Sequence, residues 1–195
     1  MSILAPEKIQ WRADVETARE EAQAQNKMVL VELFSPKCIG CQNMEERTFS
    51  SDDVAQVLEE QFVPVHYDVL ANPEMMKPFM AIWTPTVVAQ CPDGNTHRKW
   101  VGFLPPHQFL GELALARVNY ALARQSYDEA HKLAQAAVET TTGDELRHSE
   151  ALYWQAVAAY KATDNQDLLI AGWKDLLERF PNSEWAQKVD FAAEL

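Results

Sequence analysis

Two cysteines separated by two residues lie in the segment SPKCIGCQNMEERTF, residues 35–49. Cys38 and Cys41 could exchange a disulfide with another molecule, could supply half of a metal site, or could close a loop as a structural disulfide. Exchange and metal binding both use the thiolate form, whereas a structural disulfide uses the pair only as a cross-link. The neighbouring residues favour one of these three chemistries.

The position of Cys38 favours disulfide exchange. The run MVLVELF, residues 28–34, is typical of a buried strand, and helical sequence follows the cysteines. A thiol at the start of a helix is close to unpaired backbone N–H groups and to the positive end of the helix dipole, which both stabilise a thiolate. Lys37 adds a neighbouring cation. Gly40 leaves room for Cys41, one turn into the helix, to reach back and resolve a mixed disulfide.

The first half of the chain has the pattern of an α/β domain. Apolar spacing of three and four predicts helices, and short apolar runs bounded by turn residues predict strands. CPDG, residues 91–94, is an expected turn, so the last two strands should form an antiparallel hairpin. The expected helices are 13–25, 41–47 and 52–61, and the expected strands are 28–34, 62–69, 86–90 and 97–103. Together they predict a small mixed sheet with helices on both faces, in a domain spanning residues 1–106.

The second half, residues 107–195, has a single proline and the composition of helices. We expect four to six helices there, and a weak internal repeat of about 40 residues pairs Tyr120 with Tyr160. The stretches NYALARQSYDEA and LLERFPNSEWA resemble tetratricopeptide-type helical hairpins. An ordinary helical bundle explains the same composition. The predicted architecture is therefore an α/β domain followed by an all-α domain with tetratricopeptide-like hairpins.

Several motifs in the first half resemble the thioredoxin-like fold family. VLVELFSPKCIGC is similar to the strand and active-site segment of that fold, and the similarity continues through TPT, residues 84–86, to VGF, residues 101–103. The order NKMVLVELF, C-x-x-C, MEERTF, VAQVL and FVPV resembles the subfamily in which C-x-x-C is followed by Met-Glu. The resemblance covers roughly residues 8–110, just over half of the chain.

The resemblance implies a role for each matching residue. Cys38 matches the nucleophile and Cys41 the resolving thiol. Pro85 matches the proline that takes a cis peptide bond facing the cysteines, which would leave the Thr84 backbone free to pair with a substrate strand. Gly102 matches a small residue that lines the same groove.

Other residues near these matches either border the expected groove or depart from the pattern of thioredoxins. An exposed Trp83 ring would border the substrate groove. Lys37 and the pair Ile39-Gly40 replace the tryptophan and Gly-Pro of thioredoxins proper, so the resemblance leaves the redox potential open. Glu32 occupies the position of the buried acid that assists proton transfer, and could relay a proton to Cys41. The alternative for Glu32 is a partly buried acid paired with a nearby lysine.

A zinc site would need two further ligands beside Cys38 and Cys41. Cys91 and His97 are the candidates. Cys91 lies six residues beyond the site-facing Pro85, about 20 Å along an extended strand, so one chain cannot gather these ligands. We expect no metal and no cofactor, and we expect His66 to serve strand pairing.

Composition excludes some classes of partner. The formal net charge of −12 argues against nucleic acid and anionic membranes, and no run approaches the roughly 20 apolar residues of a membrane helix. The start MSILAPEKIQW lacks a basic region and a long apolar stretch, and three cysteines suit a reducing compartment. We therefore expect a cytoplasmic location.

Two functions fit these observations. The first is a thiol-disulfide oxidoreductase that exchanges disulfides with a protein carrying a disulfide or dithiol, while the helical domain positions a partner. The alternative is a non-catalytic interaction module or redox sensor built on the same scaffold. The sequence leaves open whether the pair acts as reductant, oxidant or isomerase.

Overall fold

The computed structural model describes residues 8–195. The expectation drawn from the first residues of the chain falls largely on residues 1–7, outside the described part. The contacts divide the chain into two compact units, Met1–Phe109 and Leu110–Leu195. Each unit is described by itself.

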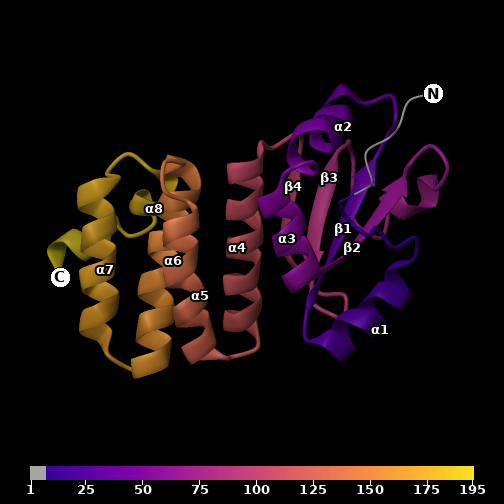
Figure 1. Cartoon of the computed structure of the whole chain (residues 1–195). Helices are drawn as coiled ribbons and strands as arrows, with labels where there is room; N and C mark the ends of the chain where they lie inside the picture. The colour runs from indigo at the N-terminus through magenta and orange to yellow at the C-terminus, as the bar shows by residue number, and fades with distance from the viewer. Residues whose placement is uncertain (1–7) are drawn as a thin grey trace. The chain divides into compact units, whose positions relative to one another are not determined.

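The first unit contains a four-stranded sheet in the order β2-β1-β3-β4 (Figure 1). β1 pairs in parallel with β2 and antiparallel with β3, which pairs antiparallel with β4. The strands are β1 Met28–Phe34, β2 Phe62–Asp68, β3 Thr86–Gln90 and β4 Thr96–Val101. The predicted mixed sheet with flanking helices is confirmed, and the hairpin of the last two strands is present.

Alternation along β1 divides its side chains between the two faces of the sheet. Val29, Val31 and Leu33 belong to a core that includes Val15 and Ala18 of α1 (Val15–Gln25). Leu30 and Glu32 therefore point to the opposite face of the sheet. The helices α2 (Ile39–Asn43) and α3 (Asp52–Gln61) cover that face. Glu32 is thus placed on the cysteine side of the sheet by the strand period alone.

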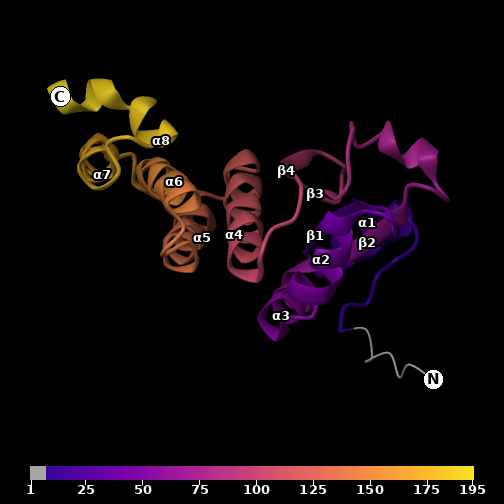
Figure 2. The same ribbon diagram turned by 90° about the horizontal axis from the view of Figure 1, so that it is seen from above.

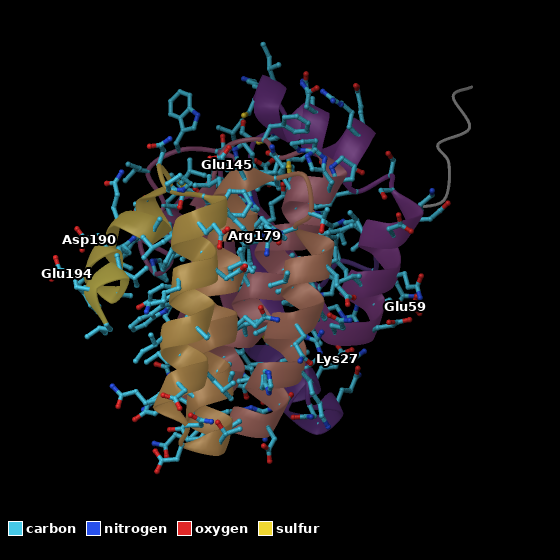
Figure 3. The ribbon with its side chains drawn as sticks, turned by 90° about the vertical axis from the view of Figure 1, so that its left-hand side faces the viewer. Lys27, Glu59, Glu145, Arg179, Asp190 and Glu194 are labelled. Carbon is cyan, nitrogen blue, oxygen red and sulfur yellow. The ribbon has the colours of Figure 1, made fainter. Side chains whose placement is uncertain are left out.

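Two short contacts fix the ends of these helices. The Asp14 carboxylate caps α1 by accepting the Thr17 N–H at 2.7 Å. The Lys27 ammonium, between α1 and β1, donates to the Glu59 carbonyl of α3 at 2.7 Å, and Figure 3 labels both residues. The helices around β1 are therefore held at their ends as well as through the core.

The expected ranges 41–47 and 97–103 do not match the observed elements. A helix was expected over 41–47, but α2 begins at Ile39 with Cys38 as its N-cap, and Met44–Thr48 continue as a π-helical turn. A strand was expected over 97–103, but β4 ends at Val101 because Gly102 has a φ of +96°. A positive φ leaves the extended conformation and ends the ladder.

The second unit is helical, as predicted. Its elements are α4 Pro106–Ala123, α5 Tyr127–Thr140, α6 Glu145–Thr163, α7 Gln166–Arg179, α8 Glu184–Gln187 and a 3₁₀ turn Asp190–Glu194. α5 packs on α6 and α6 on α7, and Figure 2 shows these three helices side by side. None of the helices within residues 8–195 combines the length and the apolar composition needed to span a bilayer.

Small residues and a buried ion-pair network hold these helices. The Arg147 guanidinium binds Glu112 and Asp144, each at 2.7 Å, and all three side chains are less than a tenth exposed. Gly172 of α7 packs so tightly on α6 that an added Cβ would lie 2.6 Å from the Cβ of Ala156. The network ties α4 to the start of α6, and Gly172 permits the close contact of α6 with α7.

The domain limits 1–106 and 107–195 stay a prediction. α4 begins at Pro106, but its first turn belongs to the first unit because Phe109 is fully buried against Phe49 and Trp100, with ring centroids 5.6 and 5.5 Å apart. The helices α4 to α7 follow one another along the chain, and α6 packs on both α5 and α7. Their tetratricopeptide-like character also stays a prediction.

Candidate functional site

The two cysteines lie at the junction of β1 and α2 with different exposure. Cys38 is half-buried and its thiol donates to the Thr84 carbonyl at 3.2 Å. Cys41 is buried, and its sulfur accepts the Ser35 N–H at 3.4 Å. Both thiols are free. One sulfur can therefore meet a partner while the other is held behind it.

The two thiols also differ in acidity. Burial raises the pKa of Cys38, but hydrogen bonds with the Thr84 side chain, with Cys41 and with the backbone of Gly40 outweigh burial, so the net pKa lies below the ordinary value. Burial raises the pKa of Cys41 to about 12. The lowered pKa of Cys38 agrees in direction with the sequence prediction, although hydrogen bonds rather than Lys37 make the largest lowering contributions. Cys38 is the nucleophile that these environments favour.

An open groove of about 480 Å³ contains Cys38. The Trp83 ring at its edge is 68% exposed, and the Thr84–Pro85 peptide bond is cis, as the resemblance implied. The groove brings together all the residues predicted to border a substrate, which are Lys37, Trp83, Thr84, Pro85 and Gly102. Their contact with a substrate stays a prediction, but the sequence identified their shared location.

Gly40 allows the helix and the proline loop to approach each other. A Cβ added to Gly40 would lie 3.0 Å from the Pro85 Cδ and 3.7 Å from the Cys38 sulfur. The Gly102 N–H donates to the Pro85 carbonyl at 2.8 Å, which fixes the opposite wall of the groove. The backbone of the loop is thereby held beside the Cys38 thiol.

Glu32 lies in a second cavity behind the cysteines. This cavity of about 300 Å³ contains Glu32 and Cys41 and is lined further by Trp11, Phe34, Ser35, Pro36, Gln42, Glu45 and His66. Glu32 is 4% exposed, and burial raises its pKa to about 8, with the nearby charges of Glu45 and Cys38 adding to the effect. Within residues 8–195 no lysine or arginine forms an ion pair with Glu32. The alternative of a lysine-paired acid is therefore wrong.

Two polar residues of this cavity, His66 and Glu45, were not predicted to lie beside Glu32. His66 lies directly beside Glu32 in the adjacent parallel strand, and Glu45 begins one helical turn after Cys41. The spacing of Cys41 and Glu45 was available in the sequence as a helical (i, i+4) pair. The pairing of Glu32 with His66 depends on the register of two strands, which the sequence did not determine.

The residues 8–195 contain no group of three or more His, Cys, Asp or Glu side chains arranged to hold a metal ion. Cys91 follows the last residue of β3, at the end of that strand remote from Pro85, and is a buried free thiol. The fourth candidate ligand, His97, lies in β4, the edge strand. The described site is a pair of thiols with a buried carboxyl group.

Known proteins resemble part of this chain. It is 34% identical over 98 residues to the thiol:disulfide interchange protein DsbD of Yersinia pestis, covering 47% of this chain and 16% of that protein. It is 30% identical over 115 residues to DsbD of Actinobacillus pleuropneumoniae, covering 56% of this chain and 19% of that protein. The chain thus spans less than a fifth of the length of these curated relatives.

A solved structure and a family profile also match part of the chain. A thioredoxin from Thermus thermophilus superimposes with a TM-score of 0.53 at 28% identity, covering 60% of this chain and 93% of that one. The profile of the thioredoxin-like domain family matches residues 15–117, more than half of the chain. The chain therefore belongs to the thioredoxin-like domain family.

Proposed function

We propose that this protein is a thiol-disulfide oxidoreductase that acts on protein substrates. The observation that carries the proposal is the asymmetry of the two thiols: Cys38 is half-buried with a lowered pKa, and Cys41 is buried with a pKa raised to about 12. Such a pair captures a disulfide with one sulfur and releases it with the other. The similarity of the first unit to interchange proteins and to a thioredoxin supports this proposal.

The proposed exchange has two steps. The Cys38 thiolate attacks a substrate disulfide, forms a mixed disulfide and displaces one substrate sulfur. Cys41 then loses its proton to the Glu32 carboxylate and attacks Cys38, which releases the second substrate sulfur. The substrate gains two electrons, and Cys38 and Cys41 become a disulfide. The same steps in reverse oxidise a dithiol, so the direction depends on the partner.

The groove supports recognition of an extended segment. Thr84 would offer backbone groups to a substrate strand, and Trp83 and Gly102 would border its side chains. Lys37, exposed beside Cys38, would face an acidic group of the substrate. We further propose that the helical unit positions the protein partner through tetratricopeptide-like hairpins, and that the protein acts in the cytoplasm, where its odd number of cysteines would stay reduced.

Trapping tests the exchange. Cys41→Ala removes the resolving thiol, so substrate should remain attached to Cys38, and mass spectrometry of purified adducts should identify the partner. Cys38→Ser in the same background is the control and should capture nothing. Absence of any adduct in cells on the Cys41→Ala chain would contradict the proposal and favour a non-catalytic interaction module.

A second arm of this experiment tests the helical unit. Adding Gly172→Ala to Cys41→Ala forces a Cβ to within 2.6 Å of Ala156 and disturbs the contact of α6 with α7. We expect fewer partner adducts but an unchanged reaction of Cys38 with a small disulfide. Equal capture of partners by the two chains would remove the proposed role of the helical unit.

A further inference from the structure

In the proposed exchange Cys41 gives its proton to Glu32, and this proton must then leave the protein. Glu32 is 4% exposed and lies in an inner strand of the sheet, so its carboxyl group needs a route to water each time Cys41 reacts. The groove that receives the substrate does not include Glu32 among its lining residues. The cavity behind the cysteines does include it, together with Cys41.

His66 lines the same cavity as Glu32 and is more exposed than Glu32. β1 and β2 are parallel neighbours in which Glu32 and His66 are direct Cα partners, so both side chains leave the sheet on the same face. Both line the cavity that contains Cys41. Glu32 is buried, whereas His66 is only half-buried. Of these two titratable groups on neighbouring strands, the imidazole is therefore the one that reaches solvent.

Two aromatic rings hold the imidazole in place. Trp11 stacks on His66 with centroids 4.9 Å apart and planes at 5°, and Phe34 lies 5.1 Å away at 36°. These contacts fix the orientation of the ring within the cavity. An imidazole also changes charge near neutral pH, which suits a group that takes up and releases protons repeatedly.

The other groups that face Glu32 do not replace His66. β3 offers Val87, α2 offers the Cys41 thiol, and Cys38, the N-cap of α2, acts on Glu32 only through its charge. The π-helical turn offers Glu45, an exposed carboxyl group whose charge raises the pKa of Glu32.

We propose that His66 carries the proton between Glu32 and solvent during resolution of the mixed disulfide. The proton leaves the Cys41 thiol for the Glu32 carboxylate, passes to the His66 imidazole and then to water. Meanwhile the Cys41 sulfur forms its bond to Cys38 and the substrate sulfur leaves as a thiolate. This proposal rests on the proposed exchange function. His66 is a proton relay that does not touch the substrate.

Single-turnover kinetics test this role. Reduced protein is mixed with a peptide disulfide, quenched with acid at successive times, and analysed by mass spectrometry for the mixed and the internal disulfide. For His66→Gln we expect unchanged formation of the mixed disulfide and resolution at least about tenfold slower at pH 7, within the usual range for a lost proton-transfer group. Added imidazole should restore resolution, because a small base can enter the emptied position. His97→Gln, a histidine of the edge strand, is the matched control and should resolve normally.

The outcomes separate the two proposals. Resolution at the wild-type rate in His66→Gln, or no rescue by imidazole, would overturn the role of His66 alone. Failure of the wild type to form any mixed disulfide would contradict the exchange function and the relay together.

A measurement on the wild type covers the case in which the variant does not fold. The His66 ring protons, followed by NMR against pH in the reduced protein, should show a second step where Glu32 titrates, near its pKa of about 8. A single independent transition of His66 would overturn the relay.

Discussion

At the scale of single residues, the buried acid Glu32 has a cost for stability. Its pKa is about 8 in the folded chain against 4.5 without burial. Below pH 4.5 the group is protonated in both the folded and the unfolded state. Between pH 4.5 and 8 the unfolded state loses the proton first, so the free energy of unfolding falls as pH rises.

Glu32→Gln should remove this loss. Relative to wild type, we expect the variant to gain free energy of unfolding between pH 4 and pH 9 by at most about 5 kcal/mol, because each pKa unit corresponds to about 1.4 kcal/mol. Urea unfolding at several pH values measures the gain, and the exposed Glu46→Gln is the control. The same variant should resolve mixed disulfides more slowly. A stability difference that does not change with pH would show that Glu32 is not a buried acid of raised pKa.

The residues of the groove could be located from the sequence, while those of the cavity could be located only in part. Cys38, Cys41 and Lys37 are contiguous, and Thr84 with Pro85 forms a recognisable motif. Glu32 could be assigned by its position in the motif. Whether it relays a proton or pairs with a lysine depends on the charges around it, which the sequence does not give. His66 and Trp11 come together through strand register and ring stacking, which a linear pattern does not contain.

At the scale of elements, α6 and α7 depend on one glycine. Gly172→Ala should lower the free energy of unfolding of the helical unit by about 1–3 kcal/mol through overpacking, although alanine is the better helix former by about 1 kcal/mol. Chemical denaturation followed by the fluorescence of Trp154, Trp173 and Trp185 measures the change. Adding Ala156→Gly removes the opposing Cβ and should restore most of the loss. A Gly172→Ala chain more stable than wild type would mean that the helices do not meet this closely.

Periodicity predicted most elements but not their irregular ends. The limits of α3 and β1 agree with the predicted ranges 52–61 and 28–34, because regular apolar patterns fill both segments. The π-helical turn at Met44–Thr48 and the end of β4 at Val101 were not predicted. Both depend on local hydrogen bonds or a positive φ, which a pattern of apolar spacing does not reveal.

At the scale of the whole molecule, the two units differ in what supports their assignment. The first unit combines fold, family membership and a site with asymmetric thiols. The second unit has helix pairs and a buried network around Arg147, but the family profile ends at residue 117. The proposed exchange chemistry therefore rests on residues of the first unit, and partner selection by the second unit is a separate proposal.

The central claim is that Cys38 reacts as an accessible thiolate while Cys41 stays protonated and buried. Alkylation of the fully reduced protein with iodoacetamide over a range of pH, read at each cysteine by mass spectrometry, measures this directly. We predict that Cys38 is modified with a midpoint below the ordinary cysteine pKa, and that Cys41 in the folded chain stays unmodified up to strongly alkaline pH. Modification of both cysteines at the same rate and with the same midpoint would contradict the account.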